Sequence, residues 1–186
     1  MSRLARAGEL IGMPIVALDS ATTEGEIKDV LVDPARSRVI GFTVRGQGLL
    51  SSPLIGILPS EHVHAIGRDA LMVASQSALV SEREGMGSAL ADQQEVVGKE
   101  IVTRSGSSLG AIGDVILEIE GAVAEVVGYE IAREGHNLIV PVPGGVPLSG
   151  EALVVPDDTE QQAANGLSSF RDVLERMRVT HSGAGA

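Results

Sequence analysis

The clearest residues that could do chemistry are the pair His62 and His64. An H-x-H spacing within a β-strand places both rings on one face, as some metal sites require. A metal site needs a third ligand, and only Glu61 is near, while Gly144 and Val146 stand at the corresponding places in the second half of the chain. We therefore interpret the pair as exposed or half-buried strand histidines, and expect neither a metal nor a cofactor.

The other residues of chemical interest form no catalytic set. The segments GMGSAL (85–90) and PGGVPLSG (143–150) lack the Lys-Ser/Thr of a phosphate-binding loop, so turns explain them. No serine lies in a G-x-S-x-G elbow, and the acidic residues show no general acid and base pairing. His136 and His181 fall in an expected turn and tail, and the absence of cysteine excludes thiol nucleophiles and disulfides. We expect no catalytic residue and no enzymatic activity.

One carboxylate occurs twice in the same setting. The stretch GEIKDVLVD (Gly25–Asp33) returns as GAIGDVILE (Gly110–Glu118), with Asp29 and Asp114 in the same position. This raises the question whether the shared Asp is a catalytic acid or a structural device, and the surrounding strand pattern favours the second.

The apolar pattern breaks at Asp29. Strict alternation would send Asp29 inward together with Ile27, whereas a β-bulge at the Lys28–Asp29 step would place Ile27, Val30 and Val32 on one face. A carboxylate at such a bulge can accept backbone N–H bonds that the bulge leaves unpaired. We therefore predict a structural carboxylate in both copies.

Further landmarks recur in the same order. ELIGMPIV (9–16) matches EVVGKEIV (95–102), and VIGFTV (39–44) matches VVGYEI (126–131), which aligns Gly41 with Gly128. Each copy then closes with a proline followed by an apolar strand. Matched landmarks in one order indicate an internal duplication.

Each copy has the pattern of β-structure. Ile40, Phe42 and Val44 alternate with their neighbours at period two, and turns are expected at Asp33-Pro34 and at Gly121. A unit of about seventy residues with five or six short strands would leave exposed edges if it stayed flat, and closing into a barrel removes them. The fold class is therefore mainly β, with two small β-barrels in tandem and a short C-terminal helix.

The segment after Pro156 predicts that helix. Leu167, Phe170, Leu174 and Met177 follow helical spacing on one stripe, and Ser168 could cap the helix. This apolar stripe is typical of a helix that packs on its own domain or of one that binds a partner. The expected parts of the chain are repeat 1 (8–75), a linker (76–92), repeat 2 (93–157), a C-terminal helical segment (158–180) and a disordered tail (181–186).

Composition narrows the class of partner. The formal net charge is −11, which argues against direct DNA binding because phosphate contacts need clustered Lys and Arg. No run approaches the ~20 apolar residues of a membrane span. The early segment LIGMPIVAL (10–18) is short and interrupted by Gly12 and Pro14, so we do not expect a cleaved signal. We expect a cytoplasmic protein.

The repeated motifs resemble the PRC-barrel domain, over about residues 8–75 and 93–157. The resemblance is carried by ELIGMPIV, GEIKDVLVD, VIGFTV and ILPSEHV in repeat 1, and by their counterparts in repeat 2. Members of that family occur in the cytoplasmic part of the photosynthetic reaction centre H subunit, in the C-terminal half of a ribosome-maturation factor, and in many stand-alone bacterial and archaeal proteins. The resemblance implies a small barrel used as a docking surface. This chain shows neither the membrane helix of the H subunit nor the N-terminal domain of the ribosome factor, so neither specific function transfers.

These observations lead to a non-enzymatic adaptor with an unknown macromolecular partner, expected to be a protein. The tandem would be a monomeric pseudo-dimer or a homo-oligomer. The loop RGQGLLSSPLIG (45–56) is the candidate contact surface, although it could equally plug the barrel. Its apolar residues are Leu49, Leu50, Leu54 and Ile55. One alternative is small-molecule or metal-ion binding between the barrels with the help of His62 and His64, and another is a ribosome-assembly accessory factor.

Overall fold

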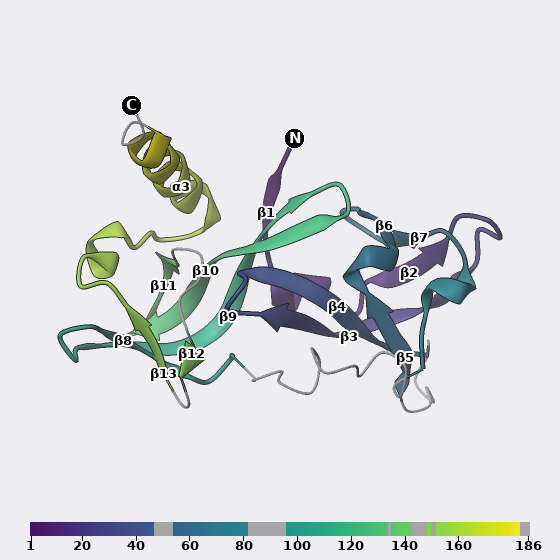
Figure 1. Ribbon diagram of the computed structural model, residues 1–186, viewed down its shortest axis with the longest axis horizontal. Helices are drawn as coiled ribbons and strands as arrows, with labels where there is room; N and C mark the ends of the chain where they lie inside the picture. The colour runs from purple at the N-terminus through teal and green to yellow at the C-terminus, as the bar shows by residue number, and fades with distance from the viewer. Residues whose placement is uncertain (47–53, 82–95, 134, 143–147, 150–151, 183–186) are drawn as a thin grey trace. The chain divides into compact units, whose positions relative to one another are not determined.

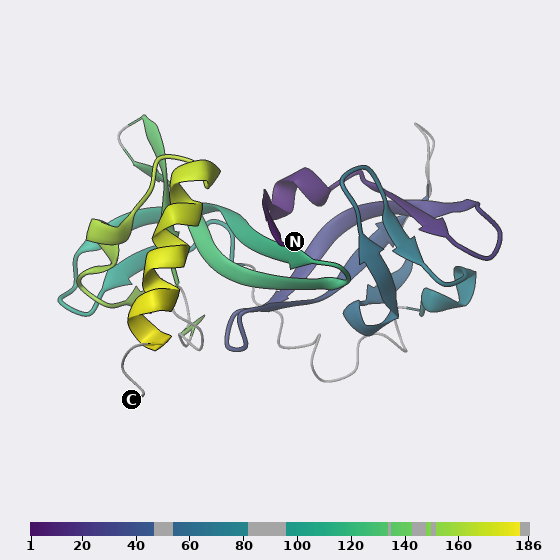
Figure 2. The same cartoon turned by 90° about the horizontal axis from the view of Figure 1, so that it is seen from above.

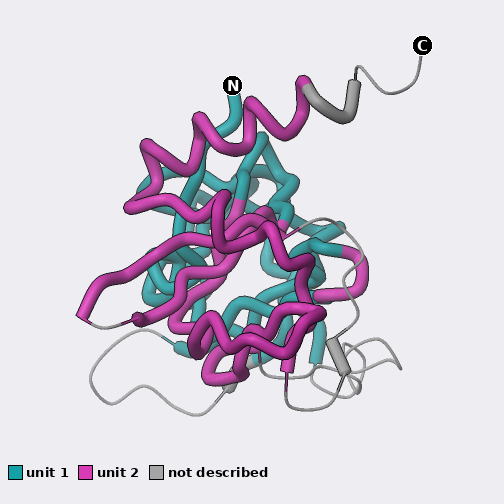
Figure 3. Tube along the Cα trace, turned by 90° about the vertical axis from the view of Figure 1, so that its left-hand side faces the viewer, with its two compact units in different colours: residues 1–33, 37–94, 118–125 teal, residues 34–36, 95–117, 126–186 magenta. Residues whose placement is uncertain are grey.

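The structure is a computed structural model that describes residues 1–46, 54–81, 96–133, 135–142, 148–149 and 152–182. The protein is mainly β, with 53% of the described residues in strands. It divides into two compact units (Figure 3). Unit 1 comprises Met1–Asp33, Ser37–Gln94 and Glu118–Glu125, and unit 2 comprises Pro34–Arg36, Glu95–Leu117 and Val126–Ala186. Each unit therefore includes a short stretch from the other repeat.

Among its described residues, repeat 1 contributes seven strands (Figure 1). They are β1 (Arg3–Arg6), β2 (Pro14–Ala17), β3 (Thr23–Asp33), β4 (Arg38–Arg45), β5 (Leu54–Pro59), β6 (Val63–Ile66) and β7 (Leu71–Val73). Short 3-10 helices lie between some of these strands or after the last of them, namely η1 (Ala7–Leu10), η2 (Ser60–His62) and η3 (Gln76–Ala78).

The described part of repeat 2 contributes six strands, a 3-10 helix and an α-helix. These are β8 (Glu100–Thr103), β9 (Ser108–Glu120), β10 (Val123–Arg133), β11 (His136–Pro141), β12 (Leu148–Ser149), β13 (Ala152–Val155), η4 (Thr159–Gln162) and α3 (Leu167–Ser182). Among the described residues, no helix has the length and apolar character to cross a membrane.

The two repeats share one strand order. In repeat 1 the order is β5-β4-β3-β2-β7-β6, and in repeat 2 it is β11-β10-β9-β8-β13-β12. The pairs are antiparallel except one in each repeat, since β2 runs parallel to β7 and β8 runs parallel to β13. The shared order and the shared parallel pair confirm that the chain is an internal duplication.

The two repeats share a turn that contains a glycine with positive φ. Gly12 has a φ of +82° and donates its N–H to Ile27 O at 2.8 Å, while Gly98 has a φ of +89° and donates its N–H to Ile112 O at 2.7 Å. A positive φ is strained for residues with a Cβ, which explains why the motif keeps a glycine here. The turn leads into β2 in repeat 1 and into β8 in repeat 2.

The segment after the last strand of each repeat pairs with a strand of the same repeat. Val80 and Ile57 exchange N–H···O bonds of 2.9 Å in unit 1, and Ala164 and Ile139 exchange bonds of 2.8 Å in unit 2. Thus residues after the last strand, at corresponding places in the two copies, cover part of the outer edge of β5 and of β11.

The cores are mostly aliphatic, and each repeat buries one aromatic residue in a strand. Phe42 and Tyr129 occupy equivalent places in β4 and β10, and each is 1% exposed. The alternation predicted for β4 holds at Phe42 and Val44 but is wrong at Ile40, because Val39 is buried and Ile40 only half-buried. A register shift opposite Leu31/Val32 changes the phase of the strand at that point.

Helix α3 packs on unit 2, as the apolar stripe predicts for a helix that covers its parent domain (Figure 2). Phe170 is fully buried and Val173 is 6% exposed, while Leu167, Leu174 and Met177 are half-buried. The predicted cap is wrong, because the helix begins before Ser168 and the Phe170 N–H donates to Gly166 O. The helix also continues through His181, which we expected in the tail.

Candidate functional site

A shallow groove of about 370 Å³ lies in unit 1, where the chain passes from β5 through η2 into β6. It is open to solvent, and the residues that line it come from η2, β6 and the segment after β7. They are Glu61, His62, Val63, His64, Ala74, Ser75, Ser77 and Ala78. Both histidines singled out by the sequence therefore border one depression, and all the residues that line it belong to unit 1.

His62 is anchored by its ring. Its Nδ1 lies 2.8 Å from Ala78 O, and because a carbonyl can only accept, Nδ1 must carry the proton. In the neutral ring Nε2 then keeps the lone pair. The prediction that both histidines lie in one strand is wrong, since His62 ends the η2 turn while His64 lies in β6. His136 is likewise not in a turn but begins β11.

The groove offers two imidazoles and little else for a metal. His62, His64 and Glu61 are all exposed. Throughout the part of the chain that the structure describes, no three His, Cys, Asp or Glu side chains are grouped so that they could hold a metal ion. The arrangement can accept a hydrogen bond or donate one nitrogen lone pair from each of two rings.

The β-bulge predicted in repeat 1 is present, with a register shift between Ile27 and Asp29. Ile27 is buried, Val32 is 7% exposed and Val30 is half-buried, while Asp29 points to solvent. Thr43, the cross-strand neighbour of Asp29, donates its Oγ1 hydrogen to Asp29 Oδ2 at 2.9 Å. This carboxylate thus joins β3 to β4 through a side chain, and not through the backbone bonds that we predicted.

In repeat 2 the place of Thr43 is taken by Glu130. Asp114 Oδ1 instead accepts the backbone N–H of Val115 at 2.7 Å. The predicted backbone bond therefore occurs in the second copy.

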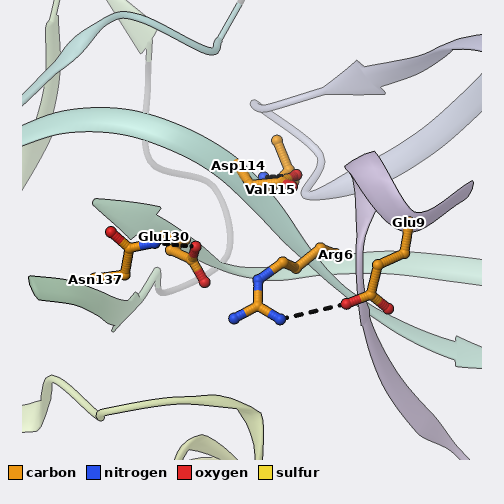
Figure 4. A network of polar contacts seen from close by, with 6 residues as sticks. All are labelled: Arg6, Glu9, Asp114, Val115, Glu130 and Asn137. Atoms are coloured by element: carbon orange, nitrogen blue, oxygen red, sulfur yellow. Dashed lines mark hydrogen bonds and ion pairs between the residues drawn. The ribbon is translucent and has the colours of Figure 1, made fainter. Parts of the chain in front are cut away.

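Glu130 is a buried carboxylate that the sequence did not single out. It is 8% exposed, and Asn137 Nδ2 of β11 donates to its Oε1 at 2.9 Å. Figure 4 shows these two side chains turned toward each other, together with the Asp114–Val115 pair and the Arg6–Glu9 ion pair. The pattern VVGYEI signals an acidic residue beside the central aromatic, but nothing in it signals burial.

Glycines at equivalent places in the two repeats let the backbone of a neighbouring strand come close. A Cβ on Gly41 would stand 2.8 Å from Leu58 O, and one on Gly128 would stand 2.6 Å from Val140 O. Gly110 has a φ of +131° and Gly25 a φ of +156° at the equivalent place in β3. These glycines thus permit strand packing in both copies.

The loop proposed from sequence as a contact surface is largely outside the described residues. Leu49 and Leu50 lie outside them, and Leu54 and Ile55 are placed only as backbone of β5. The structure instead draws attention to Ile11 and Val97. They are 50% and 54% exposed and directly precede the paired turn glycines. The repeat of an apolar residue before the paired glycines is the signal that could have indicated them.

Two repeats of curled β-structure with the same strand order and the same parallel pair define a tandem of small β-barrel domains. The family model for the PRC-barrel domain matches residues 3–79 and again residues 92–162, and the chain belongs to this family. No curated protein matches the chain.

Proposed function

We propose that the protein is a non-enzymatic adaptor, in which each PRC-barrel domain offers one apolar side chain to a partner protein. The observation that supports this is the equivalence of Ile11 and Val97, two exposed branched residues at the same turn of the two repeats. Single exposed apolar side chains are common on protein surfaces, but their recurrence at one structural position gives the pair its interest.

Both side chains project from constrained turns. In repeat 1 the Ile11 N–H donates to Gly8 O at 3.3 Å and the Met13 N–H donates to Leu10 O at 3.1 Å. In repeat 2 the Lys99 N–H donates to Val96 O at 3.2 Å. A side chain held on a fixed turn loses little conformational freedom on binding.

A bivalent mode of binding follows from the duplication. Full burial of a Val or Ile side chain is worth about 1.5–3 kcal/mol, which is too little for a stable complex from one site. Two linked sites raise the effective concentration of the second after the first has bound. The net charge of −11 favours a partner whose surface around the apolar pocket is basic.

Affinity capture from the native cell tests this proposal. The Ile11→Ser and Val97→Ser variants should each weaken capture of a specific protein, and the double variant should lose it. Val179→Ser is the matched control, because Val179 is 73% exposed but lies on α3. Equal capture by wild type and the double variant would refute the role of these two residues.

A second candidate function is binding of a small molecule or metal ion in the groove of His62 and His64. It rests on the anchored ring of His62, whose Nε2 is left to accept. A thermal-shift series with Zn²⁺ and Ni²⁺ tests it, because a ligand that binds the native state raises the melting midpoint. The shift should vanish in His64→Ala and persist in His136→Ala, which removes an exposed histidine of β11. A shift that both variants retain would place the metal elsewhere.

The proposal places the adaptor in the cytoplasm, as a monomeric pseudo-dimer or a homo-oligomer. Cell fractionation tests the first statement, and light scattering tests the second. Cosedimentation with small ribosomal subunits at low salt would instead support the ribosome-assembly alternative.

A further inference from the structure

The turn between β9 and β10 belongs to unit 1, although most of both strands belongs to unit 2. The stretch concerned is Glu118–Glu125 (Figure 3). Two of its side chains are buried, Ile119 at 2% and Ala124 at 6% exposure. A hairpin turn of repeat 2 therefore contributes apolar residues to the unit that repeat 1 builds.

Backbone bonds fasten this turn to repeat 1. The N–H of Ile66, the last residue of β6, donates to Gly121 O at 2.8 Å, and Glu125 pairs with Arg38 at the start of β4. Ile66 is itself buried. Without the turn, the N–H of Ile66 would lose this partner and the edge of β6 would be left open at that point.

Two groups at the N-terminus also contact this turn. Ser2 Oγ donates to Glu118 Oε1 at 2.8 Å, and the terminal ammonium lies 3.5 Å from Glu120 Oε1. Unit 2 in turn includes Pro34–Arg36, the turn between β3 and β4. The two turns occupy equivalent places in the two repeats.

We propose that the end of β6, the start of β4 and the N-terminal residues of repeat 1 form a docking surface for a PRC-repeat hairpin turn, and that its occupant is the β9–β10 turn of the same chain. On this proposal the two repeats are held together by exchanged turns, and the linker is not needed for their association. A second copy of the chain could offer the same turn, and the experiment separates the two cases.

The full chain carries the test. A protease site is inserted within 82–94, the folded protein is cleaved, and the product is examined by size-exclusion chromatography and native mass spectrometry. The two fragments should remain together as a complex with the mass of one chain. Separation of fragments that stay folded by circular dichroism would overturn the proposal, and a stable complex of twice that mass would overturn the assignment to the same chain.

Matched glycine variants locate the contact. Gly121 and Gly135 both lie in hairpin turns, with φ of +63° and +83° and no atom within 4 Å of an added Cβ. Only Gly121 lies in the exchanged turn. Because valine is strained at positive φ, Gly121→Val should raise the dissociation constant of the cleaved halves about tenfold, while Gly135→Val should leave it unchanged. Equal effects of the two substitutions would contradict the proposal.

A second pair of variants avoids backbone strain. Ser2→Ala with Glu118→Gln removes a Ser–Glu bond at the docking surface, and it should weaken association of the halves. Ser108→Ala with Glu100→Gln removes a similar bond of 2.7 Å between β9 and β8, and it should not. Equal weakening by both double variants would count against the surface.

Discussion

Phe170 of α3 lies directly over the backbone of Gly128 in β10. A Cβ added to Gly128 would stand 2.6 Å from Phe170 Cζ and 2.6 Å from Val140 O. The glycine thus allows the helix and strand β11 to approach β10 from two directions, and it explains why a residue without a side chain recurs in this motif.

Gly128→Ala should lower the free energy of unfolding by at least about 2 kcal/mol, because the methyl group meets a backbone oxygen that cannot move aside easily. Urea denaturation measures the loss. Gly113→Ala is the control in the neighbouring strand, since its Cβ would meet nothing closer than Glu130 O at 3.7 Å. That variant should stay within about 0.5 kcal/mol of wild type. Similar losses in both variants would contradict the close approach at Gly128.

Tyr129 should make the protein sensitive to alkali. Burial raises the pKa of Tyr129 to about 12 from its ordinary value of 10.0. The folded state therefore resists ionisation that the unfolded state permits. Stability is fully present below pH 10 and falls as the pH rises toward 12, by about 2–3 kcal/mol for two units.

The chain suits this measurement, because Tyr129 is its only tyrosine and it has no tryptophan. Near-ultraviolet absorbance should show tyrosinate forming near pH 12 or together with unfolding. Tyr129→Phe should remove most of the loss of stability between pH 10 and 12. Titration of the folded protein near pH 10 would disprove the burial argument.

Asp157 should make the protein less stable at low pH, whereas Tyr129 makes it less stable at high pH. The backbone N–H of Ser105 donates to Asp157 Oδ1 at 2.9 Å, and this bond, followed by that of the Ser105 side chain, lowers the pKa of the carboxyl group. The stabilisation is present above the unfolded pKa of about 3.9 and is lost as the pH falls through the lower folded value. Carboxyl NMR should show Asp157 titrating below an ordinary aspartate, and Ser105→Pro, which removes the N–H, should bring it back.

Asp29 and Asp114 should prove structural. Asp29→Asn weakens the acceptor of the Thr43 hydroxyl on an exposed strand face, so the loss of stability should be below about 1 kcal/mol. Asp114→Ala removes the acceptor of the Val115 N–H and should cost about 1 kcal/mol. Urea denaturation gives both values. Loss of partner capture in a fully stable Asp29→Asn variant would instead reveal a functional carboxylate.

The duplication, the bulge at Lys28–Asp29 and the turn at Gly121 could all be predicted, because each depends on local spacing and turn chemistry. The second register shift, at Leu31/Val32, could not, since it depends on how β3 meets β4 across the sheet. The same holds for His62, whose 3-10 turn is tied to Ala78 through a contact distant in sequence.

The candidate site was harder to predict than the fold. Apolar residues beside Gly12 and Gly98 read as the beginning of a buried strand, and only the turn geometry shows Ile11 and Val97 to be exposed. The membership of the β9–β10 turn in unit 1 could not be predicted either, because the sequence pattern of one repeat carries no information about contacts with the other.

The membership of Glu118–Glu125 in unit 1, and of Pro34–Arg36 in unit 2, bears on how a duplicated gene can change. A substitution in either turn therefore acts on the unit formed mainly by the other repeat. A deletion of the second half would also remove a piece of the first unit.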